Sequence, residues 1–85
     1  MASYKLVFKR SVKKDLRKID SAHPDAILNR IKTLTKDPRP PGCKKLKGQD
    51  VYRVRQGNFR IVYEIMDDRL VVIVVAVGSR GRVYS

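Results

Sequence analysis

The residues in this chain with the clearest chemical potential are three arginines in the stretch VYRVRQGNFRIVY, residues 51–63. Guanidinium groups form bidentate, charge-assisted hydrogen bonds to phosphate oxygens, so a cluster of them suits the binding of a phosphodiester. Arginine essentially never loses its proton in proteins and is therefore a poor general base. The residue types thus indicate stabilisation of a negatively charged phosphate, with any proton transfer left to another group.

The same stretch predicts a β-hairpin. Apolar residues alternate with Arg53, Arg55 and Arg60, and the pair Gly57-Asn58 in the middle is typical of a two-residue turn. In that register Arg55 lies opposite Arg60, and Arg53 lies opposite Val62. Directly opposed residues project to the same side of a sheet, so the arginines are expected on one face. The other, apolar face is expected to hold Tyr52, Val54, Ile61 and Tyr63.

Opposed arginines are unfavourable in isolation, because like charges facing each other cost a hairpin up to about 1 kcal/mol. The whole chain shares this excess of positive charge. Its formal net charge is +12, from 20 Lys and Arg against eight Asp and Glu. Such a chain attracts nucleic acid or an acidic protein. A polyanionic partner is therefore expected.

Length and composition predict one globular domain spanning residues 1–85. Eighty-five residues are enough for one hydrophobic core and too few for two, and 42% hydrophobic residues argue against disorder. The single Cys43 excludes an internal disulfide and lies in a loop without the neighbours of a metal site, so no metal or other cofactor is expected.

Membrane insertion and secretion are not expected either. The longest apolar run, Leu70 to Val77, has the length of a strand, and Lys5, Lys9 and Arg10 interrupt any signal-peptide core. We therefore expect a cytoplasmic protein.

The hydrophobic pattern predicts an α+β fold with an N-terminal strand, an α-helical hairpin and a three- to four-stranded, mainly antiparallel sheet. Residues 3–8 alternate as a short strand, and a helix follows with Ser11 as its N-cap. A second helix begins near Pro24 and ends before Asp37-Pro38. Residues 39–48 form a loop, and the arginine hairpin, a turn at 67–69, a strand at 70–77 and a basic tail complete the order.

Four segments occur in order along nearly the whole chain: SVKKDLRKI, DPRPPGCKKLKG, YRVRQGNFRIVYEI and VGSRGRVY. Together they resemble the RelE family of the RelE/ParE superfamily, the bacterial and archaeal toxins of toxin–antitoxin pairs. The resemblance implies an endoribonuclease that cuts messenger RNA in the ribosomal decoding site without a metal. It also implies an acidic, RelB-like antitoxin that silences the toxin, with operator DNA bound only through the complex of the two.

Carried over by position, the family's basic catalytic pair falls on Arg53 and Arg55, where the best-known relatives have lysine. The phosphate-stabilising arginine falls on Arg60, the C-terminal arginine on Arg80, and the late tyrosine on Tyr84. The resemblance implies these roles.

The residues leave the general base open. Tyr84, Lys47 and Glu64 are candidates, but a neighbouring cationic cluster favours ionised Glu64 and makes it a weak base. His23 lies far in sequence from the arginines and is interpreted as a surface residue. Alternatively, no strong base exists and alignment of the substrate supplies most of the rate.

Further basic residues are candidates for contacts with RNA or the ribosome, namely Lys44, Lys45, Lys47 and Arg82. Two other functions remain open. A ParE-like member of the superfamily inhibits DNA gyrase, although such members typically lack the full arginine and tyrosine set. A non-catalytic RNA- or ribosome-binding module could use the same basic sheet, because phosphate contacts alone give salt-dependent affinity.

Overall fold

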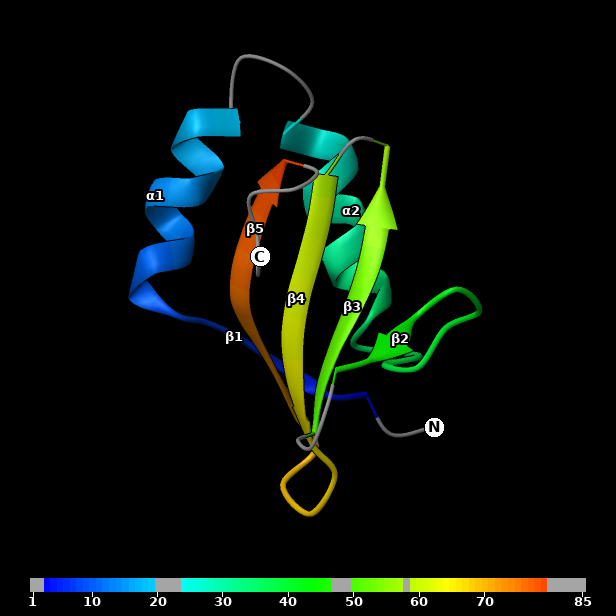
Figure 1. The fold of residues 1–85 in the computed structure, drawn as a ribbon. Helices are drawn as coiled ribbons and strands as arrows, with labels where there is room; N and C mark the ends of the chain where they lie inside the picture. Colours follow the sequence, from blue (N-terminus) through cyan, green and yellow to red (C-terminus); the bar gives the residue numbers. More distant parts are fainter. Residues whose placement is uncertain (1–2, 20–23, 47–49, 58, 80–85) are drawn as a thin grey trace.

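The computed structural model describes residues 3–19, 24–46, 50–57 and 59–79. Its elements follow in the order β1 (Lys5–Phe8), α1 (Arg10–Ile19), α2 (Pro24–Thr33), β2 (Lys44–Lys45), β3 (Val51–Gln56), β4 (Phe59–Met66) and β5 (Val71–Ser79). Their arrangement is shown in Figure 1. No helix within the described ranges is long and apolar enough to cross a bilayer.

The strands form one mixed sheet in the order β1-β5-β4-β3-β2. β1 runs parallel to β5, and every other neighbouring pair is antiparallel. The predicted α+β class and element order are confirmed. The sheet has one strand more than expected, because Lys44–Lys45, assigned to a loop from the sequence, pairs with β3 as the edge strand β2.

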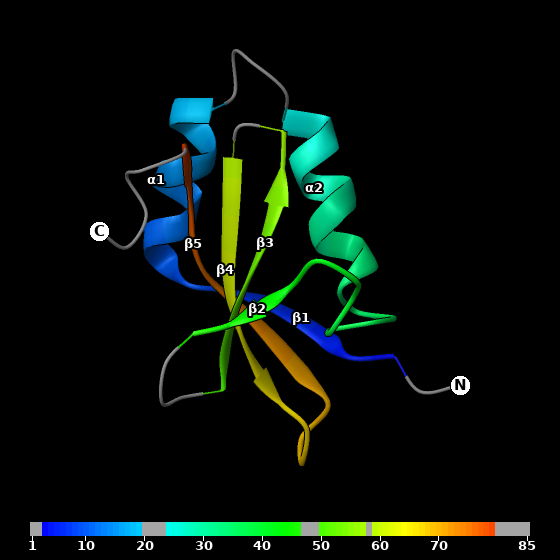
Figure 2. The ribbon, with the colours of Figure 1, turned by 45° about the vertical axis from the view of Figure 1, so that its right-hand side comes forward.

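Both helices pack on one face of the sheet, α1 against β5 and α2 against β3, as the turned view in Figure 2 shows. Val12 of α1, two apolar residues of α2 and Leu34 just after α2 meet the inward side chains of the strands in a single core. The core comprises Val12, Ile27, Ile31, Leu34, Tyr52, Val54, Ile61, Tyr63, Ile65, Val72, Val74 and Val77. The predicted inward face of the hairpin is therefore confirmed.

The hairpin register predicted from the sequence is also confirmed. Arg55 pairs with Arg60, Arg53 with Val62, and Gln56 with Phe59. Gly57 has φ +61°, a conformation that costs glycine little and suits the first position of the turn. One local prediction was wrong: α1 begins at Arg10, which places Ser11 inside the first turn and not at the N-cap.

β5 contains a bulge that decides which of its residues face inward. Val62 pairs with Ala76 and Tyr63 with Val74, so Val75 is an extra residue on β5. Because an extra residue shifts the alternation by one, Val77 after the bulge faces the core on the same side as Val74 before it.

A polar cluster ties the loop after α2 to the turn between β4 and β5. Arg39 binds Asp67 through two hydrogen bonds of 3.2 and 2.7 Å, and the Tyr4 hydroxyl donates to Asp67 at 2.8 Å. Arg39 also donates to the Tyr52 hydroxyl at 3.1 Å. Beside this cluster, the buried Tyr63 hydroxyl donates to the Pro38 carbonyl at 2.6 Å. These bonds fix the start of the loop that leads to β2.

The cluster predicts loss of stability in acid. Hydrogen bonds from Arg39 and then from Tyr4 hold the pKa of Asp67 below its ordinary value of 3.8. The native state therefore releases this proton more readily than the unfolded state does. The ionised Asp67 carboxylate therefore stabilises the fold fully above about pH 4, and this stabilisation is lost as the pH falls through the native pKa of Asp67.

We expect the Asp67→Asn variant to lose less stability between pH 7 and pH 3 than the wild type loses. Urea denaturation at the two pH values measures the difference. Asp68→Asn, which alters an exposed acid in the same turn, is the matched control. Equal acid sensitivity of wild type and Asp67→Asn would contradict the prediction.

Candidate nucleic-acid interface

The sheet face turned away from the helices, called the outer face below, carries the predicted arginines. The pairings place its side chains in four cross-strand rows. From the hairpin turn toward the β4–β5 turn, the rows are Arg55–Arg60–Gly78, Arg53–Val62–Ala76, Val51–Glu64–Ile73 and Met66–Val71. Positive charge therefore occupies the two rows nearest the hairpin turn, and the other two rows are mainly apolar.

The three arginines differ in exposure. Arg55 is exposed, whereas Arg53 and Arg60 are half-buried. The Nε atom of Arg60 is buried, and β4, which carries Arg60, is paired on both sides. The side chain of Arg60 is therefore more firmly held than that of the exposed Arg55. Directly opposed Cβ atoms lie about 4.5–5.5 Å apart, so Arg55 and Arg60 can reach the same phosphate.

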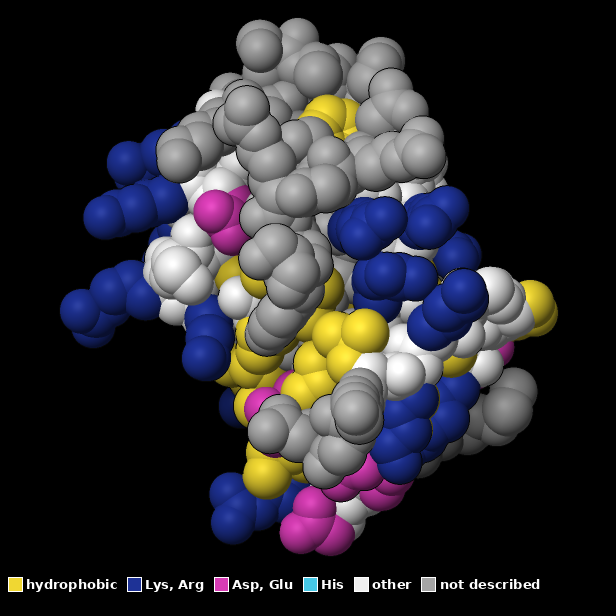
Figure 3. Space-filling model, viewed as in Figure 1, with side chains coloured by type: hydrophobic (Ala, Val, Ile, Leu, Met, Phe, Trp, Pro, Cys, Tyr) yellow, Lys and Arg dark blue, Asp and Glu magenta, His cyan; other side chains and the backbone are white. Residues whose placement is uncertain are grey.

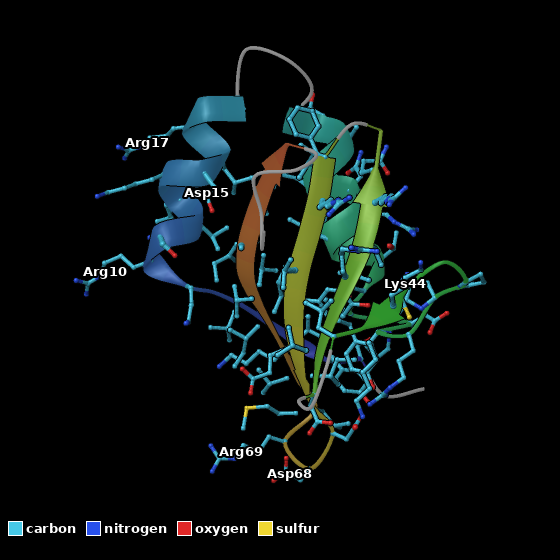
Figure 4. The ribbon with its side chains drawn as sticks, viewed as in Figure 1. Arg10, Asp15, Arg17, Lys44, Asp68 and Arg69 are labelled. Carbon is cyan, nitrogen blue, oxygen red and sulfur yellow. The ribbon has the colours of Figure 1, made fainter. Side chains whose placement is uncertain are left out.

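The basic surface continues onto the edge of the sheet. Lys44 on β2 lies opposite Arg53 and is exposed, and Lys45 is exposed with its Nζ 4.0 Å from Asp50. Figure 3 shows Lys and Arg side chains gathered over β3 and toward β2, beside a hydrophobic strip over β4 and β5. Lys44 extends from this edge in Figure 4. Lys44 therefore extends the basic outer face, whereas Lys45 pairs with the core residue Tyr52 and lies on the other side of the edge strand.

The apolar part of the outer face is partly sheltered. Val62 is fully buried although it lies outside the core cluster, and Ile73 and Val71 are half-buried. Val7 of β1, paired with Ile73, is 38% exposed and is one of the exposed large hydrophobic residues. This explains the almost continuous β-branched run of β5, because both of its faces exclude much of the solvent.

The candidates for proton transfer are only partly placed. Glu64 is half-buried on the outer face, in the row next to Arg53, as the register predicts. Lys47, Arg80, Arg82 and Tyr84, as well as His23, lie outside the described residues. Their roles stay predictions. Cys43 is a half-buried free thiol, and no group of His, Cys, Asp and Glu in the described part of the chain could hold a metal ion.

Sequence reasoning missed the positions of three residues. Arg39 resembles the other cations of its loop but is engaged with Asp67. Gly78 lies directly beside Arg60 on β5, and the Asp15 side chain contacts the β5 backbone. A signal existed for Asp15, since it is the one acid in the basic helix RSVKKDLRKI.

Comparison with known proteins agrees with this fold. A family model described as the ParE toxin of type II toxin-antitoxin system, parDE, matches residues 6–84. The mRNA interferase toxin RelE of Escherichia coli K12 is 33% identical over 88 residues, covering 98% of this chain and 92% of the relative.

Two solved structures of toxin–antitoxin complexes share the fold. The archaeal RelE–RelB complex from Pyrococcus horikoshii OT3 has a TM-score of 0.81 at 28% identity, over 95% of this chain and 99% of that one. The intact E. coli RelBE complex has a TM-score of 0.79 at 29% identity, over 94% and 100%. The chain thus belongs to the RelE/ParE superfamily of type II toxins. Within that superfamily it is a RelE family toxin.

Proposed function

We propose that this toxin is a ribosome-dependent endoribonuclease that cleaves messenger RNA in the decoding site without a metal ion. The observation that carries the proposal is the placement of Arg53, Arg55 and Arg60 on one face, opposite the helices. The name of the 33% identical relative, an mRNA interferase, supports the same activity. A ribosomal substrate implies that the toxin acts in the cytoplasm.

The proposed reaction is an internal transesterification. The 2′-oxygen of one nucleotide attacks the adjacent phosphorus, the bond from phosphorus to the 5′-oxygen breaks, and the 5′-oxygen takes a proton. The products are a 2′,3′-cyclic phosphate and a free 5′-hydroxyl. Negative charge increases on the phosphate oxygens in the transition state, and fixed cationic donors stabilise it most when they are already in position.

Arg60 is proposed to bind the reacting phosphate, because it is half-buried with its Nε atom enclosed and lies directly beside both Arg55 and Gly78. Arg55, directly opposite, contributes a second guanidinium, and Arg53 in the next row orients the neighbouring part of the messenger. Arg80 completes the set at the end of the chain. Tyr84 is assigned a stacking role on an exposed base, because aromatic rings bind unpaired bases in this way.

Proton removal from the 2′-hydroxyl is the step for which the arginines are least suited. Among the candidates, Glu64 is on the outer face, and Tyr84 and Lys47 come from the tail and the loop. Where the base is weak, alignment of the 2′-oxygen with phosphorus supplies most of the rate. Dependence on the ribosome fits this scheme, because ribosomal RNA can hold the messenger in the reactive geometry. Lys44, Lys45, Lys47 and Arg82 are proposed to contact this RNA.

The proposed protein partner is an acidic, RelB-like antitoxin. Both solved relatives described above are complexes of RelE with its antitoxin. A net charge of +12 and an outer face that joins a basic to an apolar part offer an acidic chain both attraction and buried area. Operator DNA is proposed to be bound only through this complex.

The test is primer extension on a messenger bound to ribosomes, with and without the purified toxin. We expect discrete breaks within the decoding site, each leaving a cyclic phosphate and a 5′-hydroxyl. Protection without breaks would instead indicate a binding module. Arrest of replication before translation in expressing cells would indicate a gyrase inhibitor.

A further inference from the structure

The end of β5 beside Arg60 lacks a neighbouring strand on one side. β1 pairs with β5 only from Val71 to Val74, and the last link is the hydrogen bond from the Lys9 amide to the Val74 carbonyl at 3.0 Å. Beyond this point, in the described part of the chain, helix α1 lies along the edge of β5 in place of a strand (Figure 2). Backbone amides on this edge therefore need partners that a sheet does not supply.

Asp15 supplies one of these partners. The Val77 amide donates to Oδ2 of Asp15 at 3.3 Å, across 62 residues of sequence. A carboxylate is a strong acceptor for a backbone amide, and an amide left without a partner at a partly buried position is costly. Asp15 is half-buried, and Figure 4 shows it directed toward β5 while Arg10 and Arg17 extend away from the sheet. Its position differs from that of the solvated cations of α1.

The contact between Asp15 and Val77 lies between the bulge of β5 and the direct partner of Arg60 on that strand. The bulge at Val75 precedes Val77 and shifts the alternation of the strand, so the last part of β5 is a separate short ladder with β4. Gly78 follows Val77 and is the direct partner of Arg60. A strand end attached only by a short ladder can fray or slip, and this one leads to Arg80.

We propose that Asp15 is a positioning residue of the arginine face: its carboxylate holds the Val77 backbone and thereby keeps Gly78 in register with Arg60. This inference rests on the proposed ribonuclease function for its effect on cleavage. Its effect on the backbone is independent of that function. Asp15 touches no substrate in this scheme and acts through β5.

The experiment compares Asp15→Ala and Asp15→Asn with wild type and with Asp68→Ala, which removes an exposed acid from the β4–β5 turn. Amide hydrogen exchange by NMR is read at Val77 and, as an internal reference, at Val54 of β3. Cleavage of ribosome-bound messenger gives kcat and KM. Alanine is a better helix former than aspartate, so the substitution does not weaken α1 by itself.

For Asp15→Ala we expect exchange at Val77 to rise at least tenfold while exchange at Val54 is unchanged. We expect kcat to fall about tenfold with KM unchanged. Asp15→Asn, whose side-chain oxygen still accepts a hydrogen bond, should restore both quantities to near the wild-type values, and Asp68→Ala should not alter them.

Three results would overturn the proposal: unchanged exchange at Val77, an equal rise at Val77 and Val54, or an Asp15→Asn variant as impaired as Asp15→Ala. If Asp15→Ala does not fold, the Asp15→Asn variant decides the question. Exchange at Val77 and kcat equal to those of the wild type then support the contact, and faster exchange or a lower kcat contradicts it. A wild-type chain that does not cleave messenger overturns the proposed function alone, and exchange at Val77 still decides whether Asp15 holds β5.

Discussion

Replacing Arg60 with alanine is expected to lower the rate of messenger cleavage by about 10²–10³-fold, because one positioned donor to a transition-state oxyanion contributes about 3–4 kcal/mol. Arg60 is expected to matter more than Arg55. It projects from the paired strand β4 and is half-buried, whereas Arg55 is exposed. A side chain with less freedom before the reaction loses less entropy when it binds the phosphate.

Substitutions at Arg60 and at a distant arginine test whether cleavage needs the planar guanidinium or only the positive charge. Arg60→Lys keeps the positive charge but loses the planar, bidentate donor, so its activity should lie between those of wild type and alanine. Arg69→Ala removes the same charge from the exposed β4–β5 turn, at the opposite end of β4 (Figure 4), and should cleave like wild type. Circular dichroism should show folded protein throughout, since Arg60 lies outside the core cluster. Full activity of Arg60→Ala would defeat the assignment of this site.

Much of the fold was predictable because its signals are local. Alternation of apolar and basic residues around Gly57 determined the register of the hairpin, and Arg55 opposite Arg60 follows from a two-residue turn alone. Apolar spacing predicted the two helices, and Val12 and Ile31 lie on their inward sides. Patterns of this kind depend on a few neighbouring residues, so they can be recognised without knowing how the rest of the chain folds.

The features that escaped prediction depend on pairs of residues far apart in sequence. The two-residue strand at Lys44–Lys45 has no alternation of its own and exists because β3 offers an edge. The bulge at Val75 lies within an almost continuous run of β-branched residues, where no turn or bulge residue such as glycine marks it. The contacts of Arg39 with Asp67 and of Asp15 with Val77 join loops and elements that only the folded chain brings together.

The candidate site was likewise predictable from the sequence only in part. Three arginines on one face follow from alternation, and the hairpin confirms that placement. The different exposure of the three arginines cannot be predicted from the alternation, because the burial of Arg60 depends on the strands on both sides of β4. Sequence analysis assigned no role to Arg39, whereas its bonds to Asp67 and Tyr52 use its charge within the protein.

The second large effect is expected at Gly78, because the outer side chains of β5 become smaller toward the arginines. Ile73 is followed on this face by Ala76 and then by Gly78, the direct neighbour of Arg60. A residue without a side chain lets another molecule approach the backbone closely. We infer that the reacting nucleotide lies over Gly78 while Arg60 binds its phosphate. Under the proposed function, the substrate would lie against β5 on one side and the arginines of β3 and β4 on the other.

Gly78→Val should therefore lower cleavage by at least about 100-fold, a loss of roughly 2.7 kcal/mol in transition-state binding. Valine is well accepted in strands, so the fold should persist, and its branched side chain would occupy the surface beside the Arg60 guanidinium. Gly78→Ala should have a smaller effect, and Ala76→Val, one row farther from Arg60, should also be milder. Wild-type cleavage by Gly78→Val would show that the nucleotide approaches Arg60 from the β3 side, where Arg55 alone would flank it.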